Sequence, residues 1–417
     1  MIKSIYHLAK RLHSDSLYRN SFYLMASTFA MAFFGFFFWI INARLYKPES
    51  VGITTSLISV ISLLSTVSLF GFNNGIVSYL PKEKDKNHMI NTMFTFTGVA
   101  GVVISIVFLL GLSFFAPKLL FIRANPLFIA GFIVLVVLSV WNIMTDSAFL
   151  AFRSTQYTFL ANLISSFAKL VAPFFFISLG GAGIFAAYVT YLTLSTGISF
   201  LLMFIRLGYK PKMDVDKKII RQTAKFSFMN YLAGTIGMLP TLIIPIWILN
   251  RLGAKEAAYY YMASMIMALL GIIPSGITRS LFAEGSHNQK HMKALIKKAV
   301  IGVVVLVIPA IIITIIFGGT VLTLFGESYS EEGFRLLQLM AASLLFTSTN
   351  HILGSIFNIR KETGTILGMT VFGAITILLL INSLINLKLN GVGFAWLISQ
   401  MITAFVFLII FFLKKHD

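Results

Sequence analysis

Two long uncharged stretches with similar endings decide the fold of this chain. The first is SFYLMASTFAMAFFGFFFWIINA at residues 21–43, and Arg44 follows it directly. The second is FSFMNYLAGTIGMLPTLIIPIWILN at residues 226–250, and Arg251 follows it directly. A helix crosses a bilayer with about 20 apolar residues, at ~1.5 Å of rise per residue. Each stretch is therefore long enough to form a transmembrane helix.

The composition shows that lipid is the main solvent of the chain. Hydrophobic residues make up 58% of the 417 residues and charged residues only 11%. Soluble domains are about 45–50% apolar and about 25% charged. Backbone groups in the hydrocarbon layer must be bonded within each spanning segment, which favours helices. The chain contains no cysteine, so disulfides and thiol chemistry are excluded.

The apolar pattern repeats after about half of the chain. Asn42 and Asn250 are 208 residues apart, and so are Asn142 and Asn350. Shorter motifs support the repeat: a Gly-x-Gly occurs at 181–183 and again at 391–393, and Arg153 lies opposite the Arg-Lys pair at 360–361. Two halves with six helices each keep the same orientation, as in parallel transporter repeats related by an axis along the membrane normal.

We therefore expect an all-α membrane protein with about 12 transmembrane helices. Its two six-helix parallel repeats would form a two-lobed V with a central cleft. The predicted domains are an N-terminal lobe at 1–208, which begins with a short interfacial helix, a cytoplasmic connector at 209–225, and a C-terminal lobe at 226–417. The predicted helices are 21–43, 51–80, 89–116, 126–152, two within 157–205 divided at 180–183, 226–250, 257–280, 299–325, 334–359, 363–387 and 391–413.

The distribution of positive charge predicts the orientation of these helices. With the N-terminus in the cytoplasm, 24 of the 33 Lys and Arg residues fall in cytoplasmic segments and eight on the other side. Cytoplasmic loops carry such an excess of Lys and Arg. We expect a multi-pass protein of the cell membrane with both termini in the cytoplasm. The same distribution accounts for the net charge of +19 without a nucleic-acid partner.

Two charged residues are predicted inside membrane helices. Lys169 lies near the middle of the fifth predicted helix, and Asp146 lies in the fourth. Charges within the membrane are costly and mark functional sites by default. The two side chains either pair as a structural bridge or line a cavity, where Lys169 would bind an anion and Asp146 would respond to a coupling ion. The repeat places Gly354 and Ile377 at the equivalent positions of the second half, which favours a functional role.

The remaining candidate binding residues are arginines and asparagines. Arginines near helix ends either snorkel to the headgroups or bind phosphate with both arms of the guanidinium group. Amides in apolar stretches either join helices or line a water-filled space. We find no catalytic motif, no metal-ligand spacing and no cofactor-binding loop, so we expect neither an enzyme nor a cofactor. The candidates of this group are Arg44, Arg251, Arg153, Arg279, Asn42, Asn250 and Asn142.

Several short motifs together resemble a known family. They are WIINARLYKPESVG at 39–52, GFNNG at 71–75, LP at 80–81, AFR at 151–153 and SLFAE at 280–284. This pattern resembles the polysaccharide-biosynthesis (lipid-linked oligosaccharide) flippases of the multidrug/oligosaccharidyl-lipid/polysaccharide exporter superfamily, over essentially the whole chain. The resemblance implies a flippase that moves an isoprenoid-(pyro)phosphate-linked oligosaccharide or polysaccharide repeat unit across the cytoplasmic membrane by alternating access. It also implies coupling to H⁺ or Na⁺, for which Asp146 is the candidate.

Two alternatives remain open at this point. The first is a cation-coupled exporter of amphipathic small molecules, of the multidrug type. The second is a polytopic membrane glycan ligase or polymerase. The partners expected for the flippase are the lipid-linked glycan, membrane lipids and glycan-assembly proteins.

Overall fold

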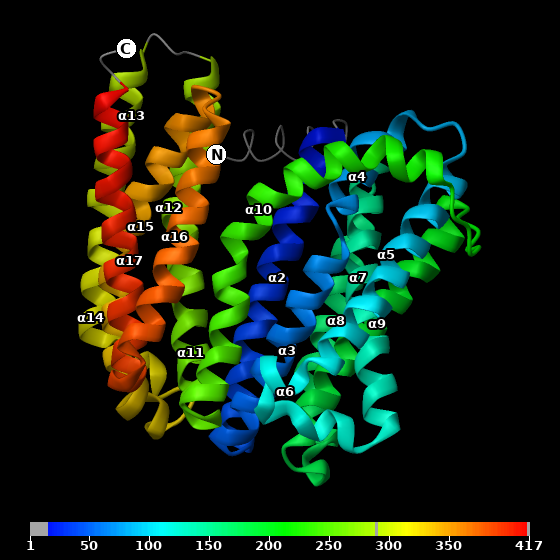
Figure 1. Cartoon of the computed structure of the whole chain (residues 1–417), viewed down its shortest axis with the longest axis horizontal. Coiled ribbons are helices and arrows are strands. Elements are labelled where there is room, and N and C mark those ends of the chain that lie inside the picture. Colours follow the sequence, from blue (N-terminus) through cyan, green and yellow to red (C-terminus); the bar gives the residue numbers. More distant parts are fainter. Residues whose placement is uncertain (1–15, 288–290, 415–417) are drawn as a thin grey trace, which may run out of the picture. The chain divides into compact units, whose positions relative to one another are not determined.

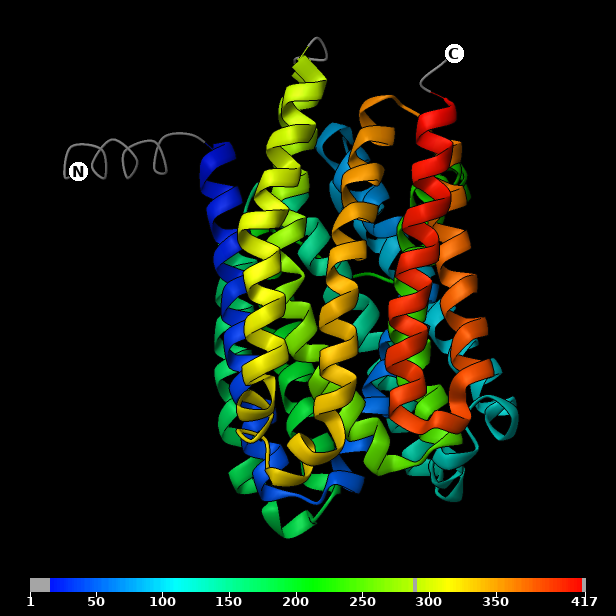
Figure 2. The ribbon, with the colours of Figure 1, turned by 90° about the vertical axis from the view of Figure 1, so that its left-hand side faces the viewer.

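The computed structural model describes residues 16–287 and 291–414. The interfacial helix expected at the N-terminus lies outside the described residues. The described residues form helices joined by turns and loops, with no β-strand among them. The chain divides into two compact units, Met1–Leu232 and Ala233–Asp417, and the division falls inside helix α10. In Figures 1 and 2, the long helices of each unit run side by side as a bundle.

The first unit is built from α2 to α9 and the first part of α10. Five of its elements (α4, α6 and the 3₁₀ helices η1, η2 and η3) are too short to cross a membrane. The elements are α2 (Ser16–Leu45), α3 (Pro48–Ser68), α4 (Phe72–Tyr79), η1 (Leu80–Lys82), α5 (Lys86–Leu110), α6 (Leu112–Phe115), η2 (Pro117–Ala124), α7 (Pro126–Ala151), α8 (Gln156–Phe175), η3 (Ile177–Leu179) and α9 (Ala182–Leu207).

The second unit begins within α10 and runs to α17. Its longest helix is α15, which packs against α12, α14 and α17. The elements are α10 (Lys217–Arg251), α11 (Ala254–Leu270), α12 (Ile272–His287), α13 (Met292–Gly302), the π-helical η5 (Val303–Val307), α14 (Ile308–Leu322), α15 (Glu327–Ile359), α16 (Thr363–Leu384), η6 (Ile385–Leu387) and α17 (Lys388–Leu413).

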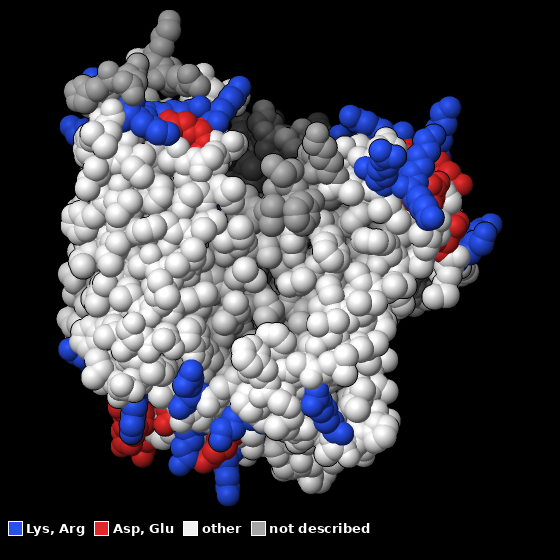
Figure 3. All heavy atoms as spheres, viewed as in Figure 1, with Lys and Arg blue, Asp and Glu red and all other residues white. Residues whose placement is uncertain are grey.

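The helices are long and apolar enough to cross a membrane. Ten stretches of the described chain meet this requirement, and one of them, Thr363–Leu413, contains both α16 and α17. These ten stretches hold eleven of the predicted helices, and the remaining one, predicted at 226–250, lies within the 35-residue α10, which is not among the ten. Figure 3 shows the charged side chains gathered at the two ends of each unit, with an uncharged band between them. The all-helical membrane fold is therefore confirmed.

Four of the predicted helices are interrupted. The helix expected over 89–116 breaks at Gly111, between α5 and α6. The helix expected over 51–80 breaks into α3 and α4, because Phe70 and Gly71 have φ angles of 45° and 79°, which a right-handed helix cannot contain. The helix expected over 257–280 breaks at Gly271, between α11 and α12. The helix expected over 299–325 contains the π-helical η5, an insertion that the apolar pattern does not reveal.

The connector predicted at 209–225 also differs from the structure, in where the following helix begins. Helix α10 begins at Lys217, before the predicted start at Phe226, so four of the eight charged residues of the predicted connector lie in a helix. Only the connector loop, residues 208–216, lies outside helices. A basic stretch suits a helix outside the bilayer as well as it suits a loop, which explains why composition alone placed the boundary too late.

The connector loop is fastened to α5. The hydroxyl of Tyr209 donates a hydrogen bond to Asn91 Oδ1 (2.7 Å), and burial raises the pKa of Tyr209 to about 12. His88 lies between two carboxylates, with its Nδ1 2.8 Å from Asp214 and its Nε2 3.1 Å from Asp216. The hydrogen bond from His88 holds the pKa of Asp216 below its ordinary value. These contacts all lie within the first unit.

The two units share backbone conformations that recur after 208 residues. Arg153 and Lys361, which follow α7 and α15, both have a positive φ, at 55° and 60°. Gly180 and Lys388 follow η3 and η6 and have nearly identical angles, φ 55° with ψ −138° and φ 54° with ψ −137°. The internal repeat is thus present in the backbone as well as in the sequence.

A glycine in each unit allows a helix to begin close to the preceding turn. A Cβ added at Gly183 would collide with the carbonyl oxygen of Phe176, and one added at Gly391 with that of Leu384. Gly183 and Gly391 are again 208 residues apart, and so are the two carbonyls. The predicted alignment of the two Gly-x-Gly motifs is therefore wrong by two residues. The shared close approach, and not the motif as written, is what requires glycine.

Candidate functional site

Lys169 lies on α8 and points at aromatic rings of neighbouring helices. Its Nζ is 4.3 Å from the ring centre of Phe38 on α2, and 5.2 and 5.9 Å from those of Tyr191 and Tyr188 on α9. A desolvated cation gains about 2 kcal/mol from an aromatic face. A lysine at the centre of a membrane helix costs about 2.5–3.5 kcal/mol. The three rings therefore offset much of the cost of the charge, and the side chain remains half-buried.

Asp146 lies on α7 beside the same aromatic group. Its carboxylate is close enough to Tyr191 for an electrostatic interaction and lies next to Thr158. No ion pair joins Asp146 or Lys169 to any described residue, so the structural bridge, one of the two alternatives considered for this pair, is not formed. The reason is that α8 packs mainly on α2 and α9 and has little contact with α7. We call Lys169, Asp146 and the three rings the Lys169 site.

A chain of polar side chains borders this site. Asn142 Nδ2 donates a hydrogen bond to Ser195 Oγ (2.9 Å), which in turn donates to Asn162 Oδ1 (3.2 Å). Asn162 Nδ2 donates to Ser27 Oγ (3.0 Å). The chain joins α7, α9, α8 and α2. Asn142 lies one helical turn before Asp146 and acts as a link between helices.

The other predicted site residues of the first unit lie at the end of α2 and beyond α7. Asn42 is fully buried, and its Nδ2 donates to the carbonyl oxygen of Phe38 (2.7 Å), so it adjoins the Lys169 site. Arg44 is exposed in the last turn of α2, and Arg153 is exposed just after α7. The positions of both arginines suit side chains that reach toward headgroups.

The predicted site residues of the second unit are separated. Arg251 is exposed in the last turn of α10, next to the half-buried Asn250. Arg279 is exposed on α12 and lines a cavity inside the second unit. Of these three residues, Arg279 lines a cavity that could hold a ligand.

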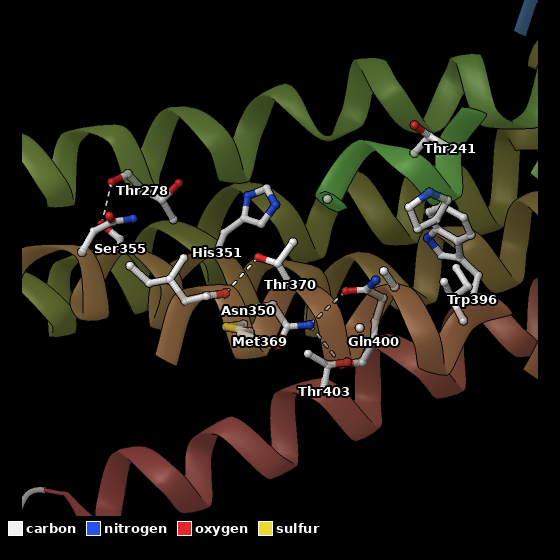
Figure 4. Close-up of a pocket in the computed structure, with 18 of the residues that line it drawn as sticks. Thr241, Thr278, Asn350, His351, Ser355, Met369, Thr370, Trp396, Gln400 and Thr403 are labelled. Atoms are coloured by element: carbon white, nitrogen blue, oxygen red, sulfur yellow. Dashed lines mark hydrogen bonds between the residues drawn. The ribbon is translucent and has the colours of Figure 1, made fainter. Parts of the chain in front are cut away.

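This cavity has a volume of about 560 Å³ and is bounded by α10, α12, α15, α16 and α17 (Figure 4). Asn350 Nδ2 on α15 donates hydrogen bonds to Gln400 on α17, to Oε1 at 2.9 Å and to the backbone carbonyl at 3.2 Å. Ser355 Oγ on α15 donates to the Thr278 carbonyl on α12 (3.1 Å). Polar groups of three helices thus fix the walls of the cavity.

The cavity and the Lys169 site involve equivalent positions of the repeat. The 208-residue register pairs Asp146 with Gly354 and Lys169 with Ile377, and both residues of the second unit line the cavity. Where the first unit carries two charges, the second has a residue without a side chain and an apolar residue. At these two equivalent positions, the first unit is charged and the second is uncharged.

The sequence does not mark the rings or the cavity as site features. The rings of the Lys169 site belong to a chain with 41 Phe and 14 Tyr, most of which we expect in lipid contact or core packing. One signal exists, since Tyr188 and Tyr191 are three residues apart and therefore share a helix face. In the described part of the chain, no group of three or more His, Asp and Glu side chains could hold a metal ion.

Solved structures with the same fold are membrane transporters. The lipid II flippase MurJ in an inward closed conformation superimposes with a TM-score of 0.74 at 13% identity, covering 93% of this chain and 87% of MurJ. An inward-facing multidrug resistance MATE family transporter of the MOP superfamily gives a TM-score of 0.70 at 16% identity, covering 91% of this chain and 93% of that one. At such identities the similarity shows the fold alone.

The sequence also matches a family. The model of the polysaccharide biosynthesis protein family matches residues 41–333, which is more than half of the chain. The chain belongs to this family. A Shigella flexneri protein assigned as an O-antigen transporter is 30% identical over 102 residues. That match spans only about a quarter of either chain, 24% of each.

Proposed function

We propose that the protein is a flippase that moves an isoprenoid-(pyro)phosphate-linked oligosaccharide or polysaccharide repeat unit across the cell membrane by alternating access. The family match, the O-antigen transporter relative and the fold shared with a lipid II flippase support this function. The protein acts as a transporter and not as an enzyme, and its termini lie in the cytoplasm. Alternating access would need two states of the chain that open to opposite sides of the membrane.

The observation that carries the proposal is the state of Lys169. Its ammonium group lies within a membrane helix and forms no ion pair with a described residue, so its charge has no counter-charge in the described part of the chain. The aromatic rings stabilise the cation without neutralising it. A phosphate or pyrophosphate group is a suitable counter-charge, because lysine binds phosphate as a point charge.

Asp146 supplies the second part of the mechanism. It is a carboxylate inside a membrane helix, and it too forms no ion pair with a described residue. A carboxylate in this position can take up H⁺ or Na⁺ and so link the state of the site to an ion gradient. Tyr191 lies near both charged groups, so binding at one would be felt at the other through the field inside the first unit.

The second candidate is a cation-coupled exporter of amphipathic small molecules. The fold shared with a multidrug MATE transporter favours it, and so does the unpaired carboxylate of Asp146. A free lysine in the same site argues against a cationic drug, because like charges repel within a medium of low dielectric constant.

A leaflet-access assay in proteoliposomes tests the proposal with an isoprenoid-pyrophosphate oligosaccharide. Lys169→Met keeps the length of the side chain and removes its charge, and Lys169→Arg keeps the charge. A hydrogen bond to a charged group contributes about 1.5–3 kcal/mol, so Lys169→Met should slow translocation by about ten- to hundredfold. Lys169→Arg should retain most of the rate, and Lys118→Met, at an exposed lysine, should retain all of it.

Two results would contradict the proposal. Translocation by Lys169→Met at the unaltered rate would remove the lysine from the mechanism. Absence of translocation by the unaltered protein, together with ion-driven efflux of an amphipathic fluorescent cation, would establish the exporter instead. Thermal unfolding of each variant shows whether a lost rate reflects a lost fold.

A further inference from the structure

The cavity of the second unit is lined almost entirely by neutral groups. Among its described lining residues, Arg279 is the one ionised side chain, and no carboxylate is present. The positions that carry charge in the first unit are occupied here by Gly354 and Ile377. An anion-binding or cation-binding centre would need more than this, so the cavity suits an uncharged polar ligand.

Two polar atoms of the cavity wall lack hydrogen-bond partners among the described residues. Asn350 Oδ1 and Thr403 Oγ1 are buried and have no hydrogen-bond partner among the described residues. An unsatisfied buried polar atom costs about 1–3 kcal/mol, and both residues line the cavity, so a ligand group that reached either atom would recover part of this cost. The amide of Gln400 and the hydroxyl of Thr370 line the same space. Amides and hydroxyls both donate and accept, as the hydroxyl groups of a ligand do.

An aromatic side chain completes the lining. Figure 4 shows Trp396 at one end of the labelled residues, with Thr278 and Ser355 at the other and Asn350 between them. The indole ring offers a flat apolar face beside an N–H donor. A pyranose ring has the matching shape, with an apolar face of C–H groups and a rim of hydroxyls. The volume of about 560 Å³ lies within the range of small-ligand sites, about 300–1,000 Å³.

We propose that this cavity is a saccharide-binding site that takes a sugar residue of the transported glycan. The Trp396 ring covers the apolar face of the sugar, while Asn350, Gln400 and Thr403 bind its hydroxyls. Arg279 adds a contact for an anionic substituent where the sugar carries one. The inference rests on the proposed function only in naming the glycan as the source of the sugar.

A cavity-filling substitution tests the site. Gly354 lines the cavity, and a Cβ added there meets no atom within 4 Å, so Gly354→Leu places a side chain in the hollow without displacing the backbone. Gly368 on α16 also has open space around its Cβ but does not line the cavity, so Gly368→Leu is the matched control. Both variants introduce the same residue into a helix.

The measurement is saccharide binding by the purified full-length protein in detergent. The probes are free glucose, galactose, N-acetylglucosamine, rhamnose and lactose, followed by saturation-transfer NMR of the sugar and by tryptophan fluorescence. We expect saturable binding of at least one sugar, weakened by at least about tenfold in Gly354→Leu and unchanged in Gly368→Leu, where tenfold corresponds to about 1.4 kcal/mol. Trp396→Phe should abolish the fluorescence response.

Absence of saturable binding by all five sugars would overturn the inference, and so would unweakened binding by Gly354→Leu. The assay measures sugar binding and requires no translocation, so its result does not depend on the proposed function. Sugar binding without translocation would refute the flippase alone. Translocation without sugar binding would refute the cavity site alone.

Discussion

Replacing Lys388 by glycine should stabilise the second unit. Lys388 has φ 54° and ψ −137°, a conformation that the first unit gives to Gly180 at the equivalent position. A non-glycine residue in such a region costs about 1–3 kcal/mol. Glycine removes this strain, but it loses about 0.5–1 kcal/mol more in conformational entropy on folding. The difference predicts a net gain of about 1 kcal/mol for Lys388→Gly.

Thermal unfolding of the purified protein, followed by intrinsic fluorescence in one detergent, measures the effect. For a unit of this size, 1 kcal/mol corresponds to about 2–4 °C in the midpoint. Lys388→Ala removes the same charge but keeps a Cβ, so its midpoint should remain near that of the unaltered protein. Gly180→Ala should lower the midpoint, although its Cβ would meet no atom within 4 Å, because only the backbone conformation opposes it.

An unchanged unfolding midpoint in Lys388→Gly would contradict this prediction. An equal rise in Lys388→Ala would contradict it as well, since removal of the charge would then explain the whole effect. A neutral Gly180→Ala would show that this turn tolerates side chains in either unit.

Two further predictions concern single positions of the first unit. Gly183→Ala should destabilise the protein by about 1–3 kcal/mol, because its Cβ has no room at the start of α9, whereas Gly197→Ala on the same helix has open space and should not; the unfolding midpoints compare them. The contact of Asp216 with His88 should depend on pH, because the folded-state pKa of Asp216 is lowered. The contribution of this contact to stability is present above the ordinary carboxylate pKa and is lost as pH falls through the lowered value. The protection factors of residues 208–216 in hydrogen exchange, which correct for the intrinsic effect of pH on amide exchange, should therefore be high near neutral pH and fall in acid. Unchanged protection factors in Asp216→Asn at neutral pH would contradict this.

The fold could be predicted largely because lipid imposes long apolar segments. Runs of uncharged residues predicted the long apolar helices, and the 208-residue register reappears in the backbone at Arg153 and Lys361. The interruptions at Phe70 and in η5 could not be predicted, because apolar residues continue through them without a change in composition. The local φ angles, and not hydrophobicity, determine these breaks.

The candidate site could be predicted only in part. An intramembrane charge is conspicuous in a sequence, so Lys169 and Asp146 were found, and their roles stay predictions. Their partners depend on which helices pack together and how each helix is rotated, which the sequence does not state. The sequence therefore left an ion pair and a cavity-lining role both open, and the ion pair is absent among the described residues. The cavity of the second unit exists partly because Gly354 has no side chain, and most of its lining residues are neutral. Neither feature stands out in an apolar sequence.

The fastening of the connector loop to α5 has a consequence for biosynthesis. Tyr209 and Asp216 complete their contacts with Asn91 and His88 once the chain has been made as far as the start of α10. Ribosomes add about 5–20 residues per second, so the remaining part of the chain takes about 10–40 s longer. During that interval, all the residues that form these contacts have already been synthesised. The nascent chain can therefore form these contacts while the second unit is still entering the membrane.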